Sequence, residues 1–342
     1  MEKSKKIKLL YVGNRLSKYG YTPGVVETLG LQLENEGFEV LYAGDQLNKL
    51  KRLREMLWKT IRYGKKVDYV LIDTYSTSAF WFALGVGLIC RILFIKYIPI
   101  LHGGNLPARL KKSKFLCDLL FKKSYHNVAV SGYLHHYFNE AGYSSIIIPN
   151  NLDVNSYTFK SRSLINPNVL WVRSFHKDYN PNMAIDVMLK LTKLYPDASL
   201  TMVGPEKDSS LNNFKEYAKE KGVEKNIKIT GRLSKPEWHQ VSTGCDVFIN
   251  TTNYDNTPVS VLEAMALGLP VVTTNVGGIP FLLKNNEDAI LVEKNDSEAM
   301  FQNIKKLIDS QELVESLTKN AVIKVSKFDW EKVKLEWIKL LK

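Results

Sequence analysis

Residues 250–280 carry polar side chains in an order that suits phosphate binding. An apolar strand ends where this segment begins, a short polar loop follows, and a helix comes next. Thr257 is the expected N-cap of that helix, and Pro258 is its expected first residue. Because the first amide groups of a helix are unpaired and bind phosphate oxygens, the sequence predicts a phosphate site near Val259 and Ser260.

Glu263 lies about one turn further into the same helix, where it can turn toward the predicted phosphate site. Its neighbours Leu262, Ala264 and Met265 are apolar. A carboxylate among buried neighbours is usually bound to another group, and a ligand rich in hydroxyl groups would suit it. The alternative is a glutamate on the exposed face of a surface helix.

The elements that must position these residues are strands and helices in alternation. One alternation runs through residues 1–154 and a second through residues 155–327, while residues 328–342 form a last helix that is expected to pack back on the first domain. Such alternation predicts parallel sheets covered on both faces. The expected fold class is therefore α/β, with two Rossmann-like domains that face each other across a cleft.

Composition sets limits on the class of protein. A chain of 342 residues with 45% hydrophobic and 24% charged residues is globular and long enough for two domains. The three cysteines, Cys90, Cys117 and Cys245, form no CxxC or CxxH pattern, which excludes a disulfide framework and gives no support to a zinc site. The first residues have no signal-peptide pattern, so we expect a cytoplasmic protein.

The net charge of +12 is concentrated in the first half of the chain. Residues 1–154 carry a net charge of +10 and residues 155–342 one of +2. A basic half indicates nucleic acid, a membrane surface or a phosphorylated substrate as partner, or else a solvated lysine-rich face. No nucleic-acid module accompanies the charge, so we expect no nucleic-acid partner.

Two segments of the first half raise the question of membrane contact. Residues 79–101 are apolar, but charges interrupt them, and we expect a buried helix that leads into a strand. Residues 47–61 form an amphipathic helix whose apolar stripe, which includes Trp58, is expected to pack on the sheet. Its basic residues Lys51, Arg52 and Arg54 would then be exposed and would hold the protein against an anionic membrane surface.

Residues 250–280 resemble glycosyltransferase family 4, whose members are retaining enzymes of the two-domain GT-B fold. In this chain Asp255 is followed by seven residues, by Glu263-Ala-Met-Ala and by Gly268-Leu-Pro-Val-Val. The family more often has glutamate where this chain has Asp255. The resemblance extends over nearly the full chain, and it is most specific within residues 171–280.

The resemblance implies roles for residues of the second half in binding a nucleotide-sugar donor. Glu263 would bind the ribose hydroxyls, and Asp255 would lie near the hydroxyls of the donor sugar. Arg173 and Lys177 would bind the diphosphate, although Lys177 is one residue closer than in the usual spacing. The remaining donor contacts would come from Asn256, Thr257, Pro258 and Val259 around the sugar and phosphates, and from Gly231 and Leu233 near the base.

The first half matches the family more loosely, at Gly24 in an opening loop and at His102 after a strand. A lone histidine is more often structural, but the family also has a histidine in its cleft, so His102 is a candidate catalytic residue beside Asp255 and Arg173. No GxGxxG motif is present, which argues against a dehydrogenase.

The function implied is retaining transfer of a sugar from a nucleotide sugar to a glycan or lipid-linked acceptor, in polysaccharide or lipopolysaccharide synthesis. No metal or cofactor is expected, because no Asp-x-Asp motif occurs and cationic side chains can neutralise the diphosphate. The alternative is a catalytically silent GT-B protein that binds a glycan or a partner, for which the Asp255 substitution is the support.

Overall fold

The computed structural model describes residues 6–162 and 164–342. The chain divides into two compact units. The first unit consists of residues 1–151 and 330–342, and the second unit of residues 152–329. The sequence predicts the boundaries after residues 154 and 327. Each unit has a parallel sheet of six strands with helices, so the predicted α/β class with two Rossmann-like domains is confirmed, whereas the cleft between them stays a prediction.

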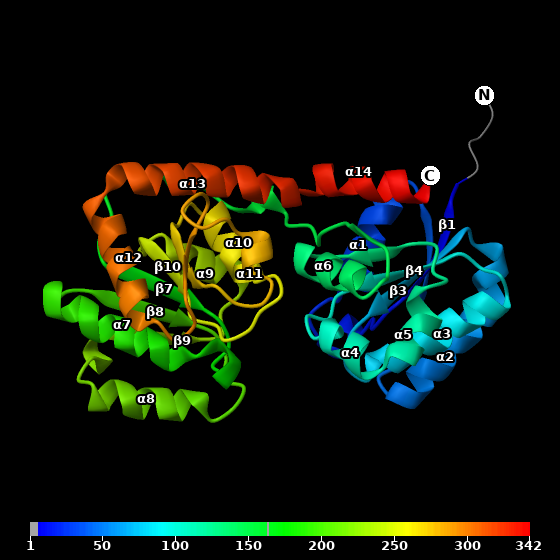
Figure 1. The fold of residues 1–342 in the computed structure, drawn as a ribbon, viewed down its shortest axis with the longest axis horizontal. Helices are drawn as coiled ribbons and strands as arrows, with labels where there is room; N and C mark the ends of the chain where they lie inside the picture. Colours follow the sequence, from blue (N-terminus) through cyan, green and yellow to red (C-terminus); the bar gives the residue numbers. More distant parts are fainter. Residues whose placement is uncertain (1–5, 163) are drawn as a thin grey trace. The chain divides into compact units, whose positions relative to one another are not determined.

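The sheet of the first unit has the strand order β2-β1-β3-β4-β5-β6, and Figure 1 labels β1, β3 and β4 of this sheet. Helices α2, α3 and α5 pack side by side with α3 in the middle. The elements of this unit are β1 Lys8–Val12, α1 Val25–Asn35, β2 Glu39–Ala43, α2 Lys49–Tyr63, β3 Tyr69–Thr74, α3 Ala79–Ile92, β4 Tyr97–Leu101, α4 Leu106–Lys112, α5 Lys114–Phe121, β5 Asn127–Ala129, α6 Gly132–Glu140, β6 Ser145–Ile147 and α14 Trp330–Leu341.

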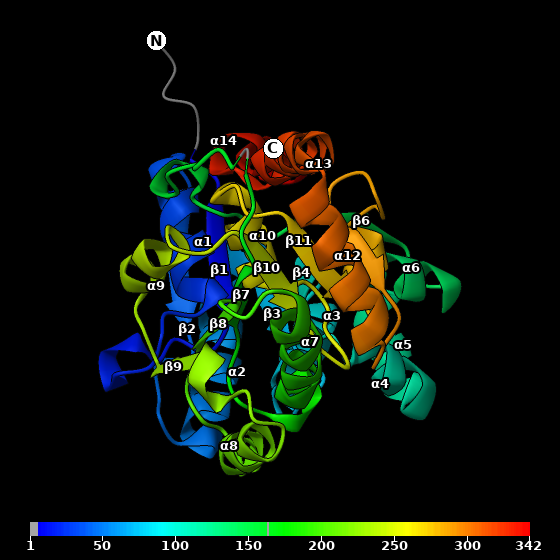
Figure 2. The same cartoon turned by 90° about the vertical axis from the view of Figure 1, so that its left-hand side faces the viewer.

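The sheet of the second unit has the strand order β12-β11-β10-β7-β8-β9. Helices α7 and α8 pack in the hydrophobic cluster on one face of this sheet and α10 in the cluster on the other, while α13 contributes residues to both clusters (Figures 1 and 2). The elements are β7 Asn168–Val172, α7 Pro181–Leu194, β8 Ser199–Val203, α8 Ser210–Glu220, β9 Ile227–Gly231, α9 Lys235–Ser242, β10 Val247–Asn250, α10 Val259–Ala266, β11 Val271–Thr274, α11 Ile279–Leu282, β12 Ile290–Val292, α12 Ser297–Asp309 and α13 Gln311–Val325.

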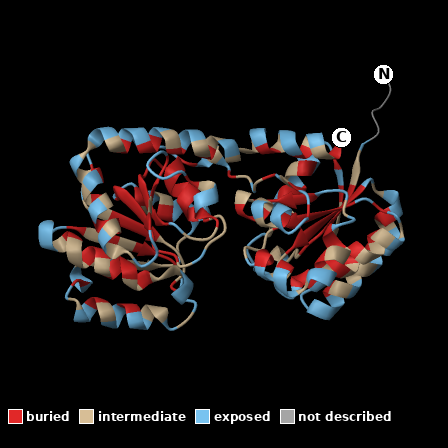
Figure 3. Cartoon of the chain, in the orientation of Figure 1, coloured by how far each residue is buried: buried red, intermediate tan, exposed pale blue. Residues whose placement is uncertain are grey.

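The strands of the second unit are buried on both faces because successive side chains point to opposite sides of a strand. Val169 and Trp171 of β7 belong to the hydrophobic core beside α7 and α12. Leu170, between them, belongs to the core beside α10. In Figure 3 the strands of each sheet are coloured as buried and the helices expose residues on their outer sides. A doubly covered sheet leaves only its strand ends open to a ligand.

In each sheet the chain reverses its direction of winding between two neighbouring strands. This switch point lies between β1 and β3 in the first unit and between β7 and β10 in the second. In open parallel sheets, ligands bind outside the carboxyl ends of the strands at such a point. The fold therefore gives each unit one place where residues from different strands converge.

The C-terminal helix α14 belongs to the first unit. Val333, Trp337 and Leu341 are buried in the core of that unit. At its start, the indole Nε1 of Trp330 donates a hydrogen bond to Glu36, and Lys334 forms an ion pair with the same carboxylate at 3.2 Å. The last helix thus completes the first domain after the chain has built the second.

Helix α3 occupies the apolar segment predicted as a buried helix, and β4 follows it. Over residues 6–162 and 164–342, the helices are all too short or too polar to cross a bilayer. The sequence did not predict α4, α5 and α6, whose short lengths give weak periodicity.

The prediction for α2 is wrong about which face packs on the sheet. The buried face carries Arg52, Met56 and Thr60, which follow one another at four-residue intervals. Leu50 and Trp58, on the stripe that was expected to pack inward, are 78% and 54% exposed. Arg52, expected at the surface, is buried because its guanidinium donates hydrogen bonds to the carbonyl groups of residues 46 and 47.

Candidate active site

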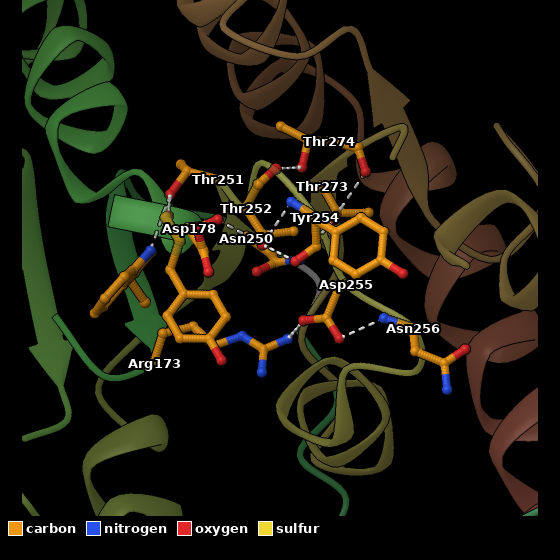
Figure 4. A network of polar contacts seen from close by, with 12 residues as sticks. Arg173, Asp178, Asn250, Thr251, Thr252, Tyr254, Asp255, Asn256, Thr273 and Thr274 are labelled. Atoms are coloured by element: carbon orange, nitrogen blue, oxygen red, sulfur yellow. Dashed lines mark hydrogen bonds and ion pairs between the residues drawn. The ribbon is translucent and has the colours of Figure 1, made fainter. Parts of the chain in front are cut away.

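At the switch point of the second unit, Arg173 and Asp255 form an ion pair (Figure 4). Arg173 directly follows β7, and Asp255 lies in the loop after β10. The Nη2 group of Arg173 donates to Oδ2 of Asp255, and the guanidinium lies 5.0 Å from the centre of the Tyr179 ring. The Nε–H group of Arg173 is buried, and the described residues offer it no hydrogen-bond partner. A donor in that state suits an anionic ligand.

Glycines at three positions let the backbone close around this pair. A Cβ atom on Gly204 would lie 1.8 Å from the carbonyl oxygen of Arg173. One on Gly277 would lie 2.1 Å from the carbonyl oxygen of Asp255, and one on Gly278 would lie 1.9 Å from that of Asn256. Because these obstacles are backbone atoms, the loop that carries Asp255 keeps its position only if all three residues are glycine.

A network of threonine hydroxyls joins the loop after β10 to neighbouring segments (Figure 4). The Thr251 hydroxyl accepts a hydrogen bond from the indole of Trp171 and donates one to the carbonyl of Tyr179. Thr252 and Thr274 also donate to backbone carbonyls of this region. Buried, satisfied networks of this kind hold a loop in one conformation, so Asp255 is presented on a rigid support.

The start of α10 differs from the prediction. The N-cap residue is Pro258, not Thr257, and the first helical residue is Val259. The Thr257 hydroxyl therefore caps nothing, and like the Ser260 hydroxyl it is buried without a hydrogen-bond partner among the described residues. Two unpaired hydroxyls beside the unpaired amide groups of a helix N-terminus are suited to bind phosphate oxygens.

Burial raises the pKa of Asp255, and the charge of Arg173 and the amide of Asn256 partly reverse this shift. That amide donates to Oδ1 of Asp255 at 2.8 Å. The Asp255 side chain is only 14% exposed, so water stabilises its negative charge little. The positive charge of Arg173 provides much of this stabilisation instead. The pair is consequently sensitive to a ligand that competes for the guanidinium.

Glu263 is buried on α10, as the sequence suggested, and its partners are two residues that the sequence did not reveal. The Tyr157 hydroxyl donates a hydrogen bond to Oε1 of Glu263 at 2.9 Å, and Nζ of Lys235 lies 2.8 Å from the same atom. Both contacts are thus made by the same oxygen of the Glu263 carboxylate. The centre of the His239 ring lies 4.8 Å from that of the Tyr157 ring. Burial lowers the pKa of His239.

Three other predicted donor contacts lie at the edge of this region. Lys177 is exposed, on a turn of 3-10 helix over Lys177–Tyr179, and its backbone amide donates to Asp208. Gly231 ends β9 with a φ of 73°, a conformation that favours glycine. Leu233 follows it and packs beside the core that includes Trp238. No contact joins these residues to Arg173 or Asp255, so their roles stay predictions.

In the first unit, His102 follows β4 and its Nε2 lies 2.9 Å from Oδ1 of Asp73 on β3. The Tyr11 hydroxyl donates to the same oxygen at 3.0 Å. Gly24 is the N-cap of α1, where its amide donates to Glu27. The sequence analysis missed Asp73, although an aspartate at the end of the apolar run 69–73 was a usable signal.

The described residues contain no group of three His, Cys, Asp or Glu side chains placed to hold a metal ion. Arg173 supplies a positive charge at this site, in its ion pair with Asp255.

Comparisons with known proteins bear on this geometry. Residues 159–323 match the family of glycosyl transferases group 1. An uncharacterized glycosyltransferase of Haemophilus influenzae is 29% identical over 157 residues, which cover 44% of this chain and 43% of that protein. The D-inositol 3-phosphate glycosyltransferase of Corynebacterium glutamicum is 24% identical over 300 residues, which cover 78% of this chain and 70% of that protein. The chain thus spans less than half of the length of the Haemophilus relative.

Among solved structures, Anabaena Alr3699/HepE in complex with UDP is similar with a TM-score of 0.77, over 98% of this chain and 99% of that one, at 18% identity. At this identity the similarity concerns the fold. The relatives named here are glycosyltransferases, the class of enzyme that the sequence predicts, and residues 159–323 of this chain match glycosyl transferases group 1 within a chain whose fold is of the GT-B type.

Proposed function

We propose that the protein is a retaining glycosyltransferase of family 4 that moves a sugar from a nucleotide-sugar donor to a glycan or lipid-linked acceptor. The observation that carries this proposal is the Arg173–Asp255 pair, which lies at a switch point together with the unpaired hydroxyls of Thr257 and Ser260. The solved structure of HepE with UDP supports a nucleoside diphosphate as the ligand of such a site. A role in polysaccharide or lipopolysaccharide synthesis is part of the proposal.

In this proposal the second unit binds the donor. The ribose hydroxyls bind to Glu263, and the diphosphate binds between Arg173, Lys177 and the start of α10. As the bond between the sugar and the diphosphate breaks, negative charge grows on the leaving group, and the positively charged Arg173 stabilises it most in the transition state. Arg173 has N–H groups for the diphosphate besides the one that holds Asp255. We propose that these cations act without a metal.

In the proposed transfer, the configuration is retained because the acceptor attacks the sugar from the side that the diphosphate leaves. Asp255 is placed to orient the hydroxyls of the donor sugar, and the first unit, with Gly24 and His102, is proposed to bind the acceptor side of the reaction.

A thermal-shift screen of the full chain tests the donor site. UDP-glucose, UDP-galactose and GDP-mannose are compared with UDP, GDP and AMP, because a ligand that binds only the folded protein raises Tm. We expect one nucleoside diphosphate and its sugar derivatives to raise Tm and Arg173→Ala to reduce that rise. If a nucleotide sugar binds but no nucleoside diphosphate is ever released, the protein is a silent binding module.

We also propose that the protein works as a peripheral protein on the cytoplasmic face of a membrane, where a lipid-linked acceptor would lie. The face of α2 that the sheet does not cover carries Leu50, Arg54, Trp58 and Ile61 along one stripe. The exposed basic residues Lys51 and Arg62 flank this stripe. An exposed apolar stripe with basic flanks is typical of helices that lie in the membrane interface.

Sedimentation with vesicles tests this second proposal. The combination Lys51→Glu, Arg54→Glu and Arg62→Glu should abolish binding to anionic vesicles, because each basic residue near an anionic surface contributes about 1 kcal/mol. Added salt should weaken binding of the wild type. The matched control changes the exposed Lys215, Lys219 and Lys225 of the second unit to glutamate. Equal sedimentation of both triple variants would contradict the proposal.

A further inference from the structure

The carboxylate of Asp73 is fixed by two hydrogen bonds at the switch point of the first unit. Its Oδ1 atom accepts from the Tyr11 hydroxyl at 3.0 Å and lies 2.9 Å from Nε2 of His102. The side chains of His102 and Asp73 are only 4% and 3% exposed. The three residues come from β1, β3 and the end of β4, so the arrangement of the sheet brings them together.

Proton positions follow from the chemistry of this cluster. Burial and the nearby Asp73 raise the pKa of Tyr11 well above its usual range, so the phenol keeps its proton and donates it to the carboxylate. Because a carboxylate oxygen only accepts hydrogen bonds, we assign the donor role in the contact with Asp73 to Nε2 of His102. In the neutral ring, a proton on Nε2 leaves Nδ1 as an acceptor.

Nδ1 of His102 is the unusual atom of this site. It is buried, and the described residues give it no hydrogen-bond partner. The ring is held in place, because the Tyr75 ring stacks on it with 5.2 Å between centroids and an angle of 29°, and the backbone amide of His102 donates to the carbonyl of Thr74. A buried polar atom without a partner is costly, so an atom held in this way suits a ligand.

Gly13 shows that the chain makes room for the carboxylate. A Cβ atom at this position would lie 2.5 Å from Oδ2 of Asp73 and 2.8 Å from Cβ of Val26. The end of β1 therefore accommodates Asp73 by omitting a side chain. A cluster that served only to fill the core would not require a charged group at this place.

We propose that Asp73 is a positioning residue that holds His102 with its proton on Nε2, so that Nδ1 accepts a hydrogen bond from a hydroxyl group of the substrate. The inference rests on the proposed sugar transfer for the identity of that hydroxyl. In this proposal the first unit offers the substrate a hydrogen-bond acceptor, whereas the second unit offers donors to the phosphates. Asp73 itself touches no substrate and acts through the imidazole.

Nuclear magnetic resonance of the full chain labelled with ¹⁵N at its histidines tests the position of the proton. The His102 signal is identified by its loss in His102→Gln. We expect a slowly exchanging proton on Nε2 and none on Nδ1 in the wild type, and loss of this protected proton in Asp73→Ala. A proton on Nδ1, or a protected proton unchanged in Asp73→Ala, would overturn the inference.

The functional test uses the nucleotide sugar that raises Tm most and measures release of the nucleoside diphosphate. Asp73→Ala should lower kcat roughly 10- to 100-fold, because misplacement of a substrate-binding group has effects of this size. The Tm rise with the nucleoside diphosphate alone should not change. Asp73→Ala combined with His102→Ala should be no slower than His102→Ala, since Asp73 acts through the ring.

Two side-chain replacements separate positioning from a structural role. His102→Asn keeps an oxygen at the δ position, whereas His102→Gln places it at the ε position, so Asn should retain more activity than Gln. Asp118→Ala is the matched control, because Asp118 also accepts a tyrosine hydroxyl, that of Tyr143. It should leave kcat unchanged. Equal activity of the two His102 variants would overturn the inference, whereas absence of release by the wild type would overturn the proposed function instead.

Discussion

The switch points of the two units both hold a carboxylate with little exposure to solvent, but the partners of the two carboxylates differ. In the first unit, Oδ1 of Asp73 accepts a hydrogen bond from the Tyr11 hydroxyl and lies 2.9 Å from Nε2 of His102. In the second unit, Asp255 is paired with the guanidinium of Arg173. In the first cluster, the buried atom without a hydrogen-bond partner among the described residues is Nδ1 of His102, which we assign as an acceptor. In the second cluster, the corresponding groups are donors: Nε of Arg173 and the hydroxyls near the start of α10.

This difference shows how one fold can present opposite chemistry at equivalent places. The parallel sheet provides the position, because strand ends converge there in both units. The residue that follows the strand determines whether the site offers a ligand a hydrogen-bond donor or an acceptor. Phosphate oxygens require donors and positive charge, whereas sugar hydroxyls can also donate to an acceptor. A division of the donor and acceptor sides of a reaction between two such domains is consistent with the proposed transfer.

The largest effect is expected for Arg173→Ala, which removes the charge from the second switch point. Turnover should fall roughly 100- to 1,000-fold, the loss typical of one electrostatic contact to a developing charge. Donor affinity should fall less, because the charge on the leaving group grows during the reaction. Arg173→Lys should restore activity in part, since a lysine lacks the two-pronged geometry. Wild-type kcat in both variants would show that another cation binds the diphosphate.

Glu263→Ala should give the next largest effect. It should lower the affinity for the nucleoside diphosphate rather than the turnover. Hydrogen bonds to a charged group contribute about 1.5–3 kcal/mol, so the nucleoside diphosphate should bind at least tenfold more weakly. Tyr157→Phe removes one hydrogen bond to Glu263 and should weaken binding less, by about 1 kcal/mol. Isothermal titration calorimetry measures both. Unchanged binding in Glu263→Ala would exclude the ribose contact.

These predictions depend on residues that the sequence revealed to different degrees. Asp255 and Glu263 could be identified because they lie within one short segment whose spacing is informative. Tyr157 and Asp73 could not, because Tyr157 lies 106 residues from Glu263 and Asp73 lies 62 residues from Tyr11. Contacts of this kind arise only when the sheet forms, and periodicity along one element carries no information about them.

Helix α2 shows a second limit of the sequence. Its strong amphipathic pattern predicted the helix correctly but assigned the wrong face to the sheet. An arginine whose guanidinium caps backbone carbonyls can lie on the packed face, and Arg52 does so. The fold class followed from strand and helix alternation, which depends on many residues, whereas the orientation of one helix depends on a few.

A comparison of glycines tests which switch point is more tightly built. Gly204→Ala places Cβ against the backbone oxygen of Arg173, whereas Gly13→Ala places it against the side chain of Asp73 and Val26. Overpacking costs about 1–3 kcal/mol, and a backbone obstacle relaxes less than a side chain, so Gly204→Ala should lower Tm more. Gly244→Ala is the control, since its nearest atom would be 3.7 Å from the new Cβ. A larger loss in Gly13→Ala would reverse the comparison.

The smallest expected effect is a pH dependence of stability that arises from Asp255 in the second unit. Burial raises the pKa of Asp255 in the folded protein, and Arg173 counteracts this shift. A carboxyl with a raised pKa in the folded state lowers stability as the pH rises from about 4, the pKa of an unfolded aspartate, through the folded value. Without Arg173 the pKa rises further, so the loss of Tm in Arg173→Ala should be about 1–3 °C larger at pH 8 than at pH 4.

Differential scanning fluorimetry over this pH range measures the difference, with Arg232→Ala as the control. Arg232 is an exposed arginine of the same unit, and its removal should give no change with pH. An equal loss of Tm at pH 4 and pH 8 in Arg173→Ala would show that Asp255 does not depend on Arg173 for its charge.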